Sequence, residues 1–225
     1  MKKAFTLLEL VFVIVVIGVL ATVIISRRED NSLQEAAAQL LSHIRYTQHL
    51  ALSDNMYRDK DKNYYKRRWQ IKFSKVGGSD NKWAYAIFHD QNADGNPNAS
   101  ETAINPADNT KKLTGGYSGT IEYSEIEATP TLNLGYAYGI KDIDFKDCNV
   151  NNNDGKKRIF FDSLGRPLSN NPKNLKSTFK YSHKSALLNK TCKIILCNID
   201  DCSTASEKQK ITIVIYKESG YSEIL

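Results

Sequence analysis

The sequence predicts an α+β protein in which a long N-terminal helix packs on a C-terminal, antiparallel β-rich head. Three observations support this fold class. An almost unbroken apolar run opens the chain, an apolar stripe at helical spacing follows it, and short alternating segments separated by turn residues fill the remainder. The expected parts are a short N-terminal segment over residues 1–4, a membrane helix over 5–26, an amphipathic helix over 27–56 and the head over 57–225.

The apolar N-terminal run is long enough to cross a bilayer as a helix. Phe5 to Ile25 matches the roughly 20 residues that span ~30 Å of hydrocarbon, and Lys2 and Lys3 precede it, as at a cytoplasmic end. A cleaved signal peptide fits poorly, because the charged region is very short and no small-residue cleavage site follows the run. One carboxylate, that of Glu9, interrupts the run. Near a helix centre it would cost about 2.5–3.5 kcal/mol, so a partner cation is expected.

The first residues form a distinctive pattern, Lys2-Lys3-Ala4, then Phe5-Thr6-Leu7-Leu8-Glu9-Leu10, then the Val/Ile-rich run. This pattern resembles the class III leader of type IV pilins and type II secretion pseudopilins. The resemblance implies a pilin-like fold, cleavage by a prepilin peptidase between Ala4 and Phe5, and methylation of the new amine. It also implies that Glu9 pairs with the Phe5 ammonium of a neighbouring subunit, which would set the register of assembly. The alternative is a plain signal anchor with a stray Glu.

No Gly or Pro interrupts residues 27–56, so the helix is expected to continue beyond the membrane. Its apolar stripe consists of Leu33, Ala36, Ala37, Leu40, Leu41, Ile44, Ala51 and Leu52. The candidate strands are residues 69–73, 83–88, 121–123, 132–138, 140–145, 159–161, 193–197 and 211–216.

Two later segments add a second resemblance. Residues 158–167 read as a strand followed by a Gly-Arg turn, and Ile211 to Tyr216 followed by Ser219-Gly220-Tyr221 reads as a final hairpin. Both resemble segments of the H-type minor pseudopilins, whose relatives include minor pilins associated with transformation.

The cysteines are even in number and lie beyond the apolar run, which predicts an oxidising compartment and two disulfides. If residues 193–196 are extended, Cys192 and Cys197 lie about 16 Å apart, too far for a bond that needs Cα atoms within about 7 Å. Two pairings remain open. The preferred one joins Cys197 to Cys202 and Cys148 to Cys192; the other joins Cys192 to Cys202 and Cys148 to Cys197.

An Asp/Asn-rich segment over residues 90–101 fits a twelve-residue calcium loop. Its predicted ligands are side-chain oxygens of Asp90, Asn92 and Asp94, the carbonyl of Asn96 and both oxygens of Glu101. The strand before the segment and the missing helix after it do not fit an EF-hand. An Asx-rich surface turn is the alternative.

Basic and aromatic residues are interleaved between positions 57 and 72, a pattern that suits DNA because phosphates attract cations and bases stack on aromatic rings. The predicted contacts are Arg58, Lys66, Arg67, Arg68 and Trp69. A solvated loop and edge strand is the alternative. The net charge of +6 is compatible with a nucleic-acid partner without requiring one.

The sequence favours a structural protein over an enzyme. Ser177-Thr178-Phe179-Lys180 fits a Ser-x-x-Lys pattern, but its companion motifs are absent. With the resemblance, the prediction is a minor pseudopilin of a type II secretion-like machine, a single-pass inner-membrane protein with a periplasmic head. Its partners would be the prepilin peptidase, other pseudopilins and an inner-membrane assembly platform. The alternatives are a minor pilin of a type IV pilus or DNA-uptake system, and a membrane-anchored binding protein that never assembles.

Overall fold

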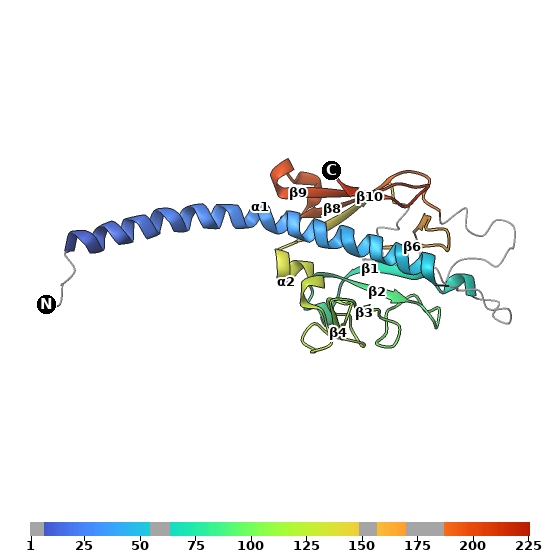
Figure 1. Cartoon of the computed structure of the whole chain (residues 1–225). Helices are drawn as coiled ribbons and strands as arrows, with labels where there is room; N and C mark the ends of the chain where they lie inside the picture. The colour runs from blue at the N-terminus through green and yellow to red at the C-terminus, as the bar shows by residue number, and fades with distance from the viewer. Residues whose placement is uncertain (1–6, 55–63, 149–156, 170–186) are drawn as a thin grey trace.

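The computed structural model describes residues 7–54, 64–148, 157–169 and 187–225, apart from the side chains of residues 21–30 and Tyr65 (Figure 1). In chain order its elements are α1 (Leu7–Ser53), η1 (Tyr64–Lys66), β1 (Trp69–Lys75), η2 (Gly77–Ser79), β2 (Trp83–His89), β3 (Ile104–Asn105), β4 (Asp108–Lys112), η3 (Pro130–Leu132), α2 (Leu134–Tyr138), β5 (Asp142–Lys146), β6 (Arg158–Phe161), β7 (Pro167–Leu168), β8 (Cys192–Cys197), η6 (Cys202–Thr204), η7 (Glu207–Gln209), β9 (Lys210–Ile215) and β10 (Ser222–Ile224).

Helix α1 is a rod of 47 residues whose first part projects from the head and whose second half lies against it (Figure 1). Apolar side chains at three- and four-residue steps bury one face of the second half, which is what stabilises a long helix in water. The buried positions are Leu33, Ala36, Ala37, Leu40, Ile44 and Ala51. The prediction was wrong for Leu52, which is 53% exposed.

A membrane-spanning half of α1 is not found in the part of the chain that the structure describes. The described apolar side chains run from Leu7 to Leu20, about 20 Å of helix at 1.5 Å per residue, which falls short of the ~30 Å hydrocarbon core. Among the described residues, no helix combines the length and apolarity needed to cross a membrane. The predicted fold, with its transmembrane half over residues 5–26, is therefore wrong, and the single-pass inner-membrane location predicted with it is corrected on the same finding.

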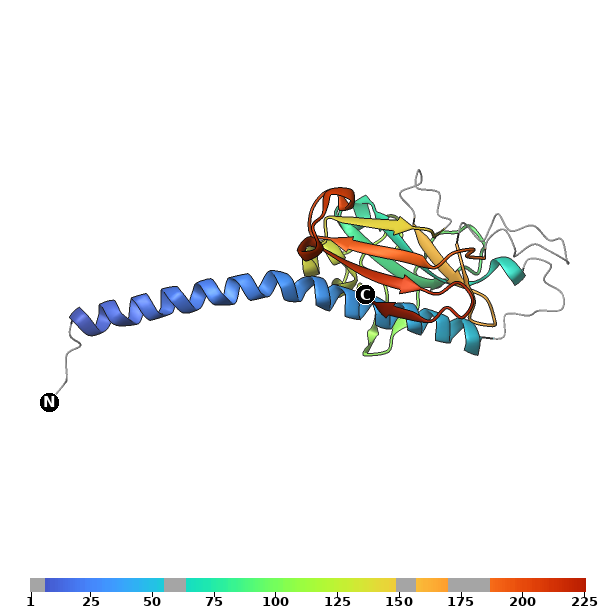
Figure 2. The ribbon, with the colours of Figure 1, turned by 90° about the horizontal axis from the view of Figure 1, so that it is seen from above.

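The head contains two four-stranded antiparallel sheets. One has the strand order β2-β1-β6-β7 and the other the order β10-β9-β8-β5, while β3 and β4 form a separate hairpin. Figure 1 shows α1 running along the seam between the two sheets, and Figure 2, a view from above, shows the same helix running along the β10 edge of the second sheet. The sheets are also joined by Lys157, which lies just before β6 and donates its ammonium to the Ile143 carbonyl of β5.

One apolar core joins α1 to both sheets. Its fully buried members include Leu40 and Ile44 of α1, Ile71 of β1 and Ile194 of β8. The rings of Phe73 and Phe145 meet edge to face across the seam, with centroids 5.3 Å apart. The second half of the helix therefore closes a core that neither sheet could close alone.

Two predicted strands are absent from the described residues. Residues 132–138 form η3 and the short helix α2 instead, because the Asn133 side chain accepts a hydrogen bond from the Tyr136 amide and caps the helix. Gly139 ends α2 in the left-handed conformation (φ 69°). Residues 121–123 lie in a loop, where Ile121 is buried without a strand partner.

The side chains on one face of β1 are polar, and they are buried. Alternation along this strand predicts that Gln70, Lys72 and Ser74 face solvent, yet all three are buried. The Lys72 ammonium donates to Asn96 Oδ1 at 2.7 Å and to the Tyr117 hydroxyl at 2.8 Å. The loops after β2 therefore cover this face and satisfy its polar groups, as buried charges require.

Both disulfides follow the preferred pairing, which is confirmed. Cys148 is bonded to Cys192 with Cα atoms 4.4 Å apart, and Cys197 to Cys202 with Cα atoms 5.6 Å apart. The first bond ties the chain after β5 to the start of β8, and the second closes a tight turn after β8. The described residues include no free cysteine.

A neutral histidine ties α1 to β2. Gln39 Nε2 donates to the Tyr85 hydroxyl at 3.0 Å, and His43 Nδ1 lies 2.7 Å from the same hydroxyl. The Tyr85 hydroxyl oxygen accepts the hydrogen bond from Gln39, so its own O–H donates to His43 Nδ1. An imidazole nitrogen accepts a hydrogen bond only when the ring is neutral. Burial accordingly lowers the pKa of His43 from 6.5 to about 4.

We expect His43 to make the fold acid-sensitive. Because its pKa is lowered on folding, its stabilisation is complete above pH 6.5 and is lost as the pH falls toward 4, by at most about 3 kcal/mol. Urea unfolding at pH 7 and at pH 4.5 should show a smaller acid loss for His43→Gln than for the parent, by about 2 kcal/mol. His49→Gln, at an exposed position of the same helix, is the control and should keep the parent's acid loss.

The disulfides are expected to contribute unequally. The Cys148–Cys192 bond has a sequence separation of 44 and the Cys197–Cys202 bond one of 5. Loop-closure entropy predicts stabilisation of about 4 kcal/mol for the first and about 2 kcal/mol for the second. Unfolding free energies of the two paired Cys→Ser variants measure both values, and equal losses would contradict the entropic account.

Candidate assembly surface and the contacts that position it

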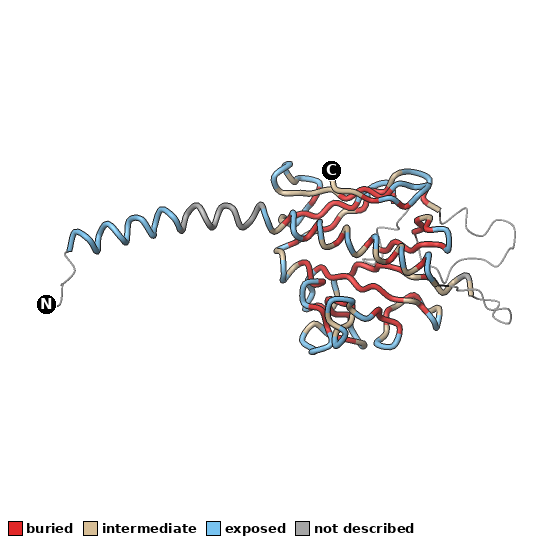
Figure 3. The backbone as a smooth tube through the Cα atoms, viewed as in Figure 1, coloured by how far each residue is buried: buried red, intermediate tan, exposed pale blue. Residues whose placement is uncertain are grey.

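The first part of α1 carries an apolar surface on all of its sides. Leu7 is 82% exposed, Leu8 80% and Phe12 69%, and every other described residue to Leu20 is also exposed (Figure 3). We call residues 7–20 the projecting segment. A helix that is apolar all round is normally buried, and exposed apolar surface of this extent marks an interaction site. The described residues of the head cover none of it.

Glu9 is the acidic residue in the first turn of α1. A carboxylate is favourable there, because the first amides of a helix carry partial positive charge. The predicted cleavage and methylation positions, Ala4 and Phe5, lie outside the described residues, as does Ser177–Lys180. Of the predicted processing and assembly residues, Glu9 is therefore the one whose placement the structure describes, and it lies on the exposed projecting segment.

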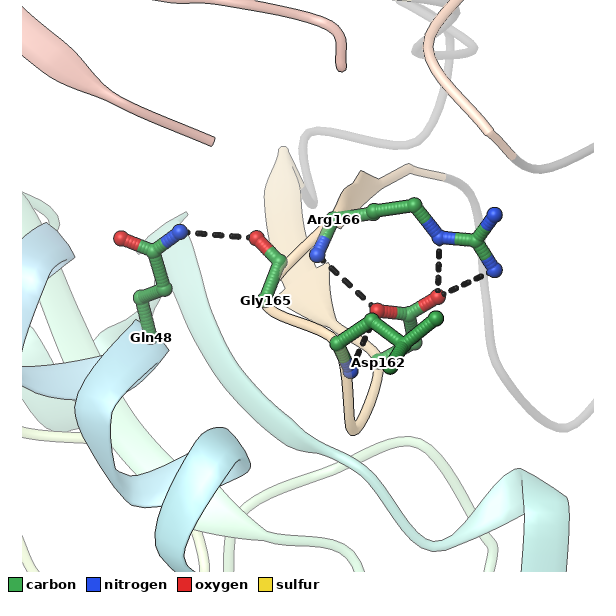
Figure 4. A network of polar contacts seen from close by, with 5 residues as sticks. Gln48, Asp162, Gly165 and Arg166 are labelled. Atoms are coloured by element: carbon green, nitrogen blue, oxygen red, sulfur yellow. Dashed lines mark hydrogen bonds and ion pairs between the residues drawn. The ribbon is translucent and has the colours of Figure 1, made fainter. Parts of the chain in front are cut away.

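The far end of α1 is fixed to the head by Gln48. Its Nε2 donates to the Gly165 carbonyl at 2.8 Å and to the Ser219 carbonyl at 2.8 Å, and Figure 4 shows the first of these contacts. The two carbonyls belong to the turn after β6 and to the turn between β9 and β10. We call this arrangement the Gln48 clamp. It joins one strand turn from each sheet to the helix.

Asp162 shapes the first of these turns (Figure 4). Its Oδ1 accepts from the Leu164 amide at 3.0 Å and from the Arg166 amide at 2.9 Å, while Oδ2 pairs with the Arg166 guanidinium at 2.7 Å. Gly165 then adopts a left-handed conformation (φ 74°), which lets its carbonyl face Gln48. These contacts fix the turn at Gly165, whose carbonyl accepts the hydrogen bond from Gln48.

The clamp joins the Gly-Arg turn and the final hairpin that the sequence predicts. Residues 158–167 supply the Asp162 turn, and the hairpin of β9 and β10 supplies the Ser219 carbonyl. Sequence reasoning singled out both segments but missed Gln48, because a polar residue on an amphipathic helix gives no sign of its partners. The contact of Gln48 with both turns appears only in the folded structure.

The predicted calcium loop follows β2, but its side chains are used differently from the prediction. Asn92 Oδ1 accepts from the Asp94 amide and Asp94 Oδ1 from the Asn96 amide, as in Asx turns. Glu101 Oε1 accepts from the Asn92 amide at 2.9 Å, so Glu101 is not free for two-oxygen ligation. Within the described ranges, no three His, Cys, Asp or Glu side chains are grouped to hold a metal ion, so the five-residue set as predicted is not assembled.

The predicted DNA contacts are only partly accessible. Arg58 lies outside the described residues, Lys66 and Arg67 are half-buried, and Arg68 is only 7% exposed. Burial lowers the pKa of Arg68, opposed by the nearby Asp162 charge. Trp69 stacks on His89 and donates its indole N–H to Asp54 Oδ2 at 2.9 Å. Neither Arg68 nor Trp69 is therefore placed for DNA contact.

Comparison with models of protein families, with curated proteins and with solved structures yields no match to this chain.

We expect the clamp to require glycine at position 220. A Cβ there would lie 2.4 Å from the Gly165 carbonyl oxygen and 2.5 Å from Gln48 Nε2, at a backbone φ of 69°. Gly139 has the same φ, but its Cβ would meet nothing within 4 Å. Gly139→Ala should therefore cost about 1 kcal/mol from backbone strain alone, and Gly220→Ala about 3 kcal/mol because the clash is added. Urea unfolding measures both, and equal losses would show that the clamp has no steric requirement.

Proposed function

We propose that this chain is a structural subunit, a minor pseudopilin of a type II secretion-like machine, that assembles with other subunits into a short fibre through residues 7–20. The single observation that carries the proposal is the projecting segment, apolar on every side and exposed along its described length. The N-terminal pattern that resembles prepilin leaders supports it, since it implies processing by a prepilin peptidase and docking on an assembly platform.

The energetic case follows from surface burial. Fully burying one Val, Leu, Ile or Phe side chain is worth about 1.5–3 kcal/mol. The exposed set comprises Leu7, Leu8, Leu10, Val11, Phe12, Val13, Ile14, Val15, Val16, Ile17, Val19 and Leu20. Packing this segment among the same segments of neighbouring subunits removes most of that surface from water. A bundle of such helices is therefore the occupant that the segment fits best.

Glu9 supplies specificity within this bundle. A buried carboxylate is costly unless it is paired, and pairing to one fixed cation selects one register among the many that apolar packing tolerates. The cation in this proposal is the Phe5 ammonium that prepilin cleavage would expose on a neighbouring subunit. The DNA-uptake alternative receives less support, because Arg68 and Trp69 are engaged within the head.

The assembly surface can be tested with a matched pair of charge substitutions. Ile14→Asp places an unpaired carboxylate in the proposed bundle and should reduce incorporation into sheared fibres at least tenfold, since such burial costs several kcal/mol. Ile126→Asp alters a side chain that is 86% exposed on the head and should leave incorporation unchanged. Incorporation is measured by quantitative blotting of sheared fibres against whole cells.

Processing is followed in the same samples by mass spectrometry of the N-terminus. Both variants should begin at methylated Phe5, so that a loss of assembly is not a loss of cleavage. Normal incorporation of Ile14→Asp would refute the assembly surface. Retention of Met1 to Ala4 in the parent would refute the pseudopilin assignment.

A further inference from the structure

Exposed apolar side chains gather around the Gln48 clamp. Outside the projecting segment, eight large apolar side chains are exposed among the described residues, and four of them belong to the elements that the clamp joins: Leu52, Leu164, Tyr216 and Tyr221. Single exposed apolar side chains are ordinary on a protein surface, whereas a group of them marks an interaction site. We call these four residues the tyrosine–leucine ledge.

The ledge spans three elements that lie against one another. A Cβ at Gly165 would lie 3.2 Å from Leu52 Cδ2, and a Cβ at Gly220 would lie 2.4 Å from the Gly165 carbonyl oxygen. Leu164 and Tyr221 are the chain neighbours of these two glycines, so they are brought close together. One surface therefore runs from the end of α1 over the turn after β6 to the turn between β9 and β10 (Figure 2).

Hydrogen bonds and ring contacts fix the tyrosines of the ledge. The Tyr216 and Tyr221 ring centroids are 5.9 Å apart. The Arg45 guanidinium lies over the Tyr221 ring, 5.7 Å from its centroid, and donates to the Ser222 carbonyl at 2.6 Å. The Tyr216 hydroxyl donates to Glu223 Oε1 at 2.8 Å. Side chains that are already ordered lose little further entropy on binding, which favours association through this surface.

The charges around the ledge balance one another. Its rim carries two cations and two anions, which are Arg45, Lys217, Glu218 and Glu223. The nearby Arg166 is neutralised by Asp162 at 2.7 Å. The whole chain carries +6, so two copies repel each other on average. At the ledge this repulsion is absent, and each cation of one copy can meet an anion of another.

We propose that the ledge is the contact surface of a symmetric dimer, in which the heads of two copies of this chain meet ledge to ledge. A two-fold contact uses the same patch on both copies, so the patch must be complementary to itself. The balanced rim meets this requirement. Tyrosine and arginine, which the ledge and its rim supply, are also the residue types that often dominate binding energy at interfaces. The contact lies on the head and does not rest on fibre assembly.

Photo-crosslinking of the full chain in cells tests this contact. The photoreactive residue p-benzoylphenylalanine in place of Leu164 should give a product of twice the chain mass. Mass spectrometry should find peptides of this chain alone in that product, joined at the ledge of the other copy. The same residue in place of Ile104, which is 54% exposed on β3, is the matched control and should give no such product. Absence of the product at Leu164, or a product containing another protein, would overturn the dimer.

Exchanging charges at the rim tests whether the ledge is complementary to itself. Lys217 and Glu218 are exposed, so the fold should tolerate both substitutions. Glu218→Lys leaves each rim with excess positive charge and should reduce the crosslinked product about tenfold, because like charges then face each other. Adding Lys217→Glu rebalances the rim and should restore the product. A yield that Glu218→Lys leaves unchanged, or that the double variant fails to recover, would contradict a symmetric contact.

The same crosslink separates the dimer from the fibre. It should persist in the Ile14→Asp background, in which assembly through residues 7–20 is expected to fail. Loss of the crosslink there would show that the ledges meet only through packing in the fibre. That result would overturn a dimer of the heads and leave the proposed function standing.

Discussion

The structure depends on the burial of one helical stripe against two sheets at once. Each four-stranded sheet has an apolar face, and α1 lies in the seam where both faces meet. Ala36 and Ala37 are fully buried on the stripe, and their small side chains let the helix approach the strands closely. Removing the helix would open the core of both sheets together, so the head and the second half of α1 form one cooperative unit.

Polar contacts at both ends of the docked region determine how the helix sits in that seam. Gln39 bonds to the Tyr85 hydroxyl near the start of the docked half, and Gln48 holds two turn carbonyls near its end. Between them, Arg45 Nη2 donates to the Ser222 carbonyl at 2.6 Å, which covers part of the edge of β10. Apolar burial supplies most of the free energy, while these directional contacts select one rotation and one translation of the helix.

This arrangement leaves the same helix in two environments. The docked half buries its apolar stripe against the head, whereas the projecting segment is apolar all round and the described residues of the head do not cover it. Because α1 is continuous, the direction in which the segment leaves the head is set by the docked half. A rigid connection of this kind suits a subunit whose head must take a defined position around a bundle of helices. The Gln48 clamp therefore helps to set the position of the head in the proposed assembly.

The amino-acid sequence by itself determined the features that follow from local periodicity and covalent geometry. The stripe from Leu33 to Ala51 and most of the longer strands were predicted, because helical spacing and alternation are local properties. The span of an extended strand excluded one disulfide pairing and left two open, of which the preferred one is observed. The membrane helix was predicted from apolarity alone and was wrong for the described residues.

Tertiary structure alone decided the rest. Lys72 reads as an exposed residue of an alternating strand, yet distant loops bury it against Asn96 and Tyr117. His43 becomes a neutral hydrogen-bond acceptor only because Tyr85 of β2 faces it, and Gln48 gains its role from two turns more than a hundred residues away. A polar side chain's environment depends on which segments the folded chain brings to it, and no local pattern in the sequence carries that information.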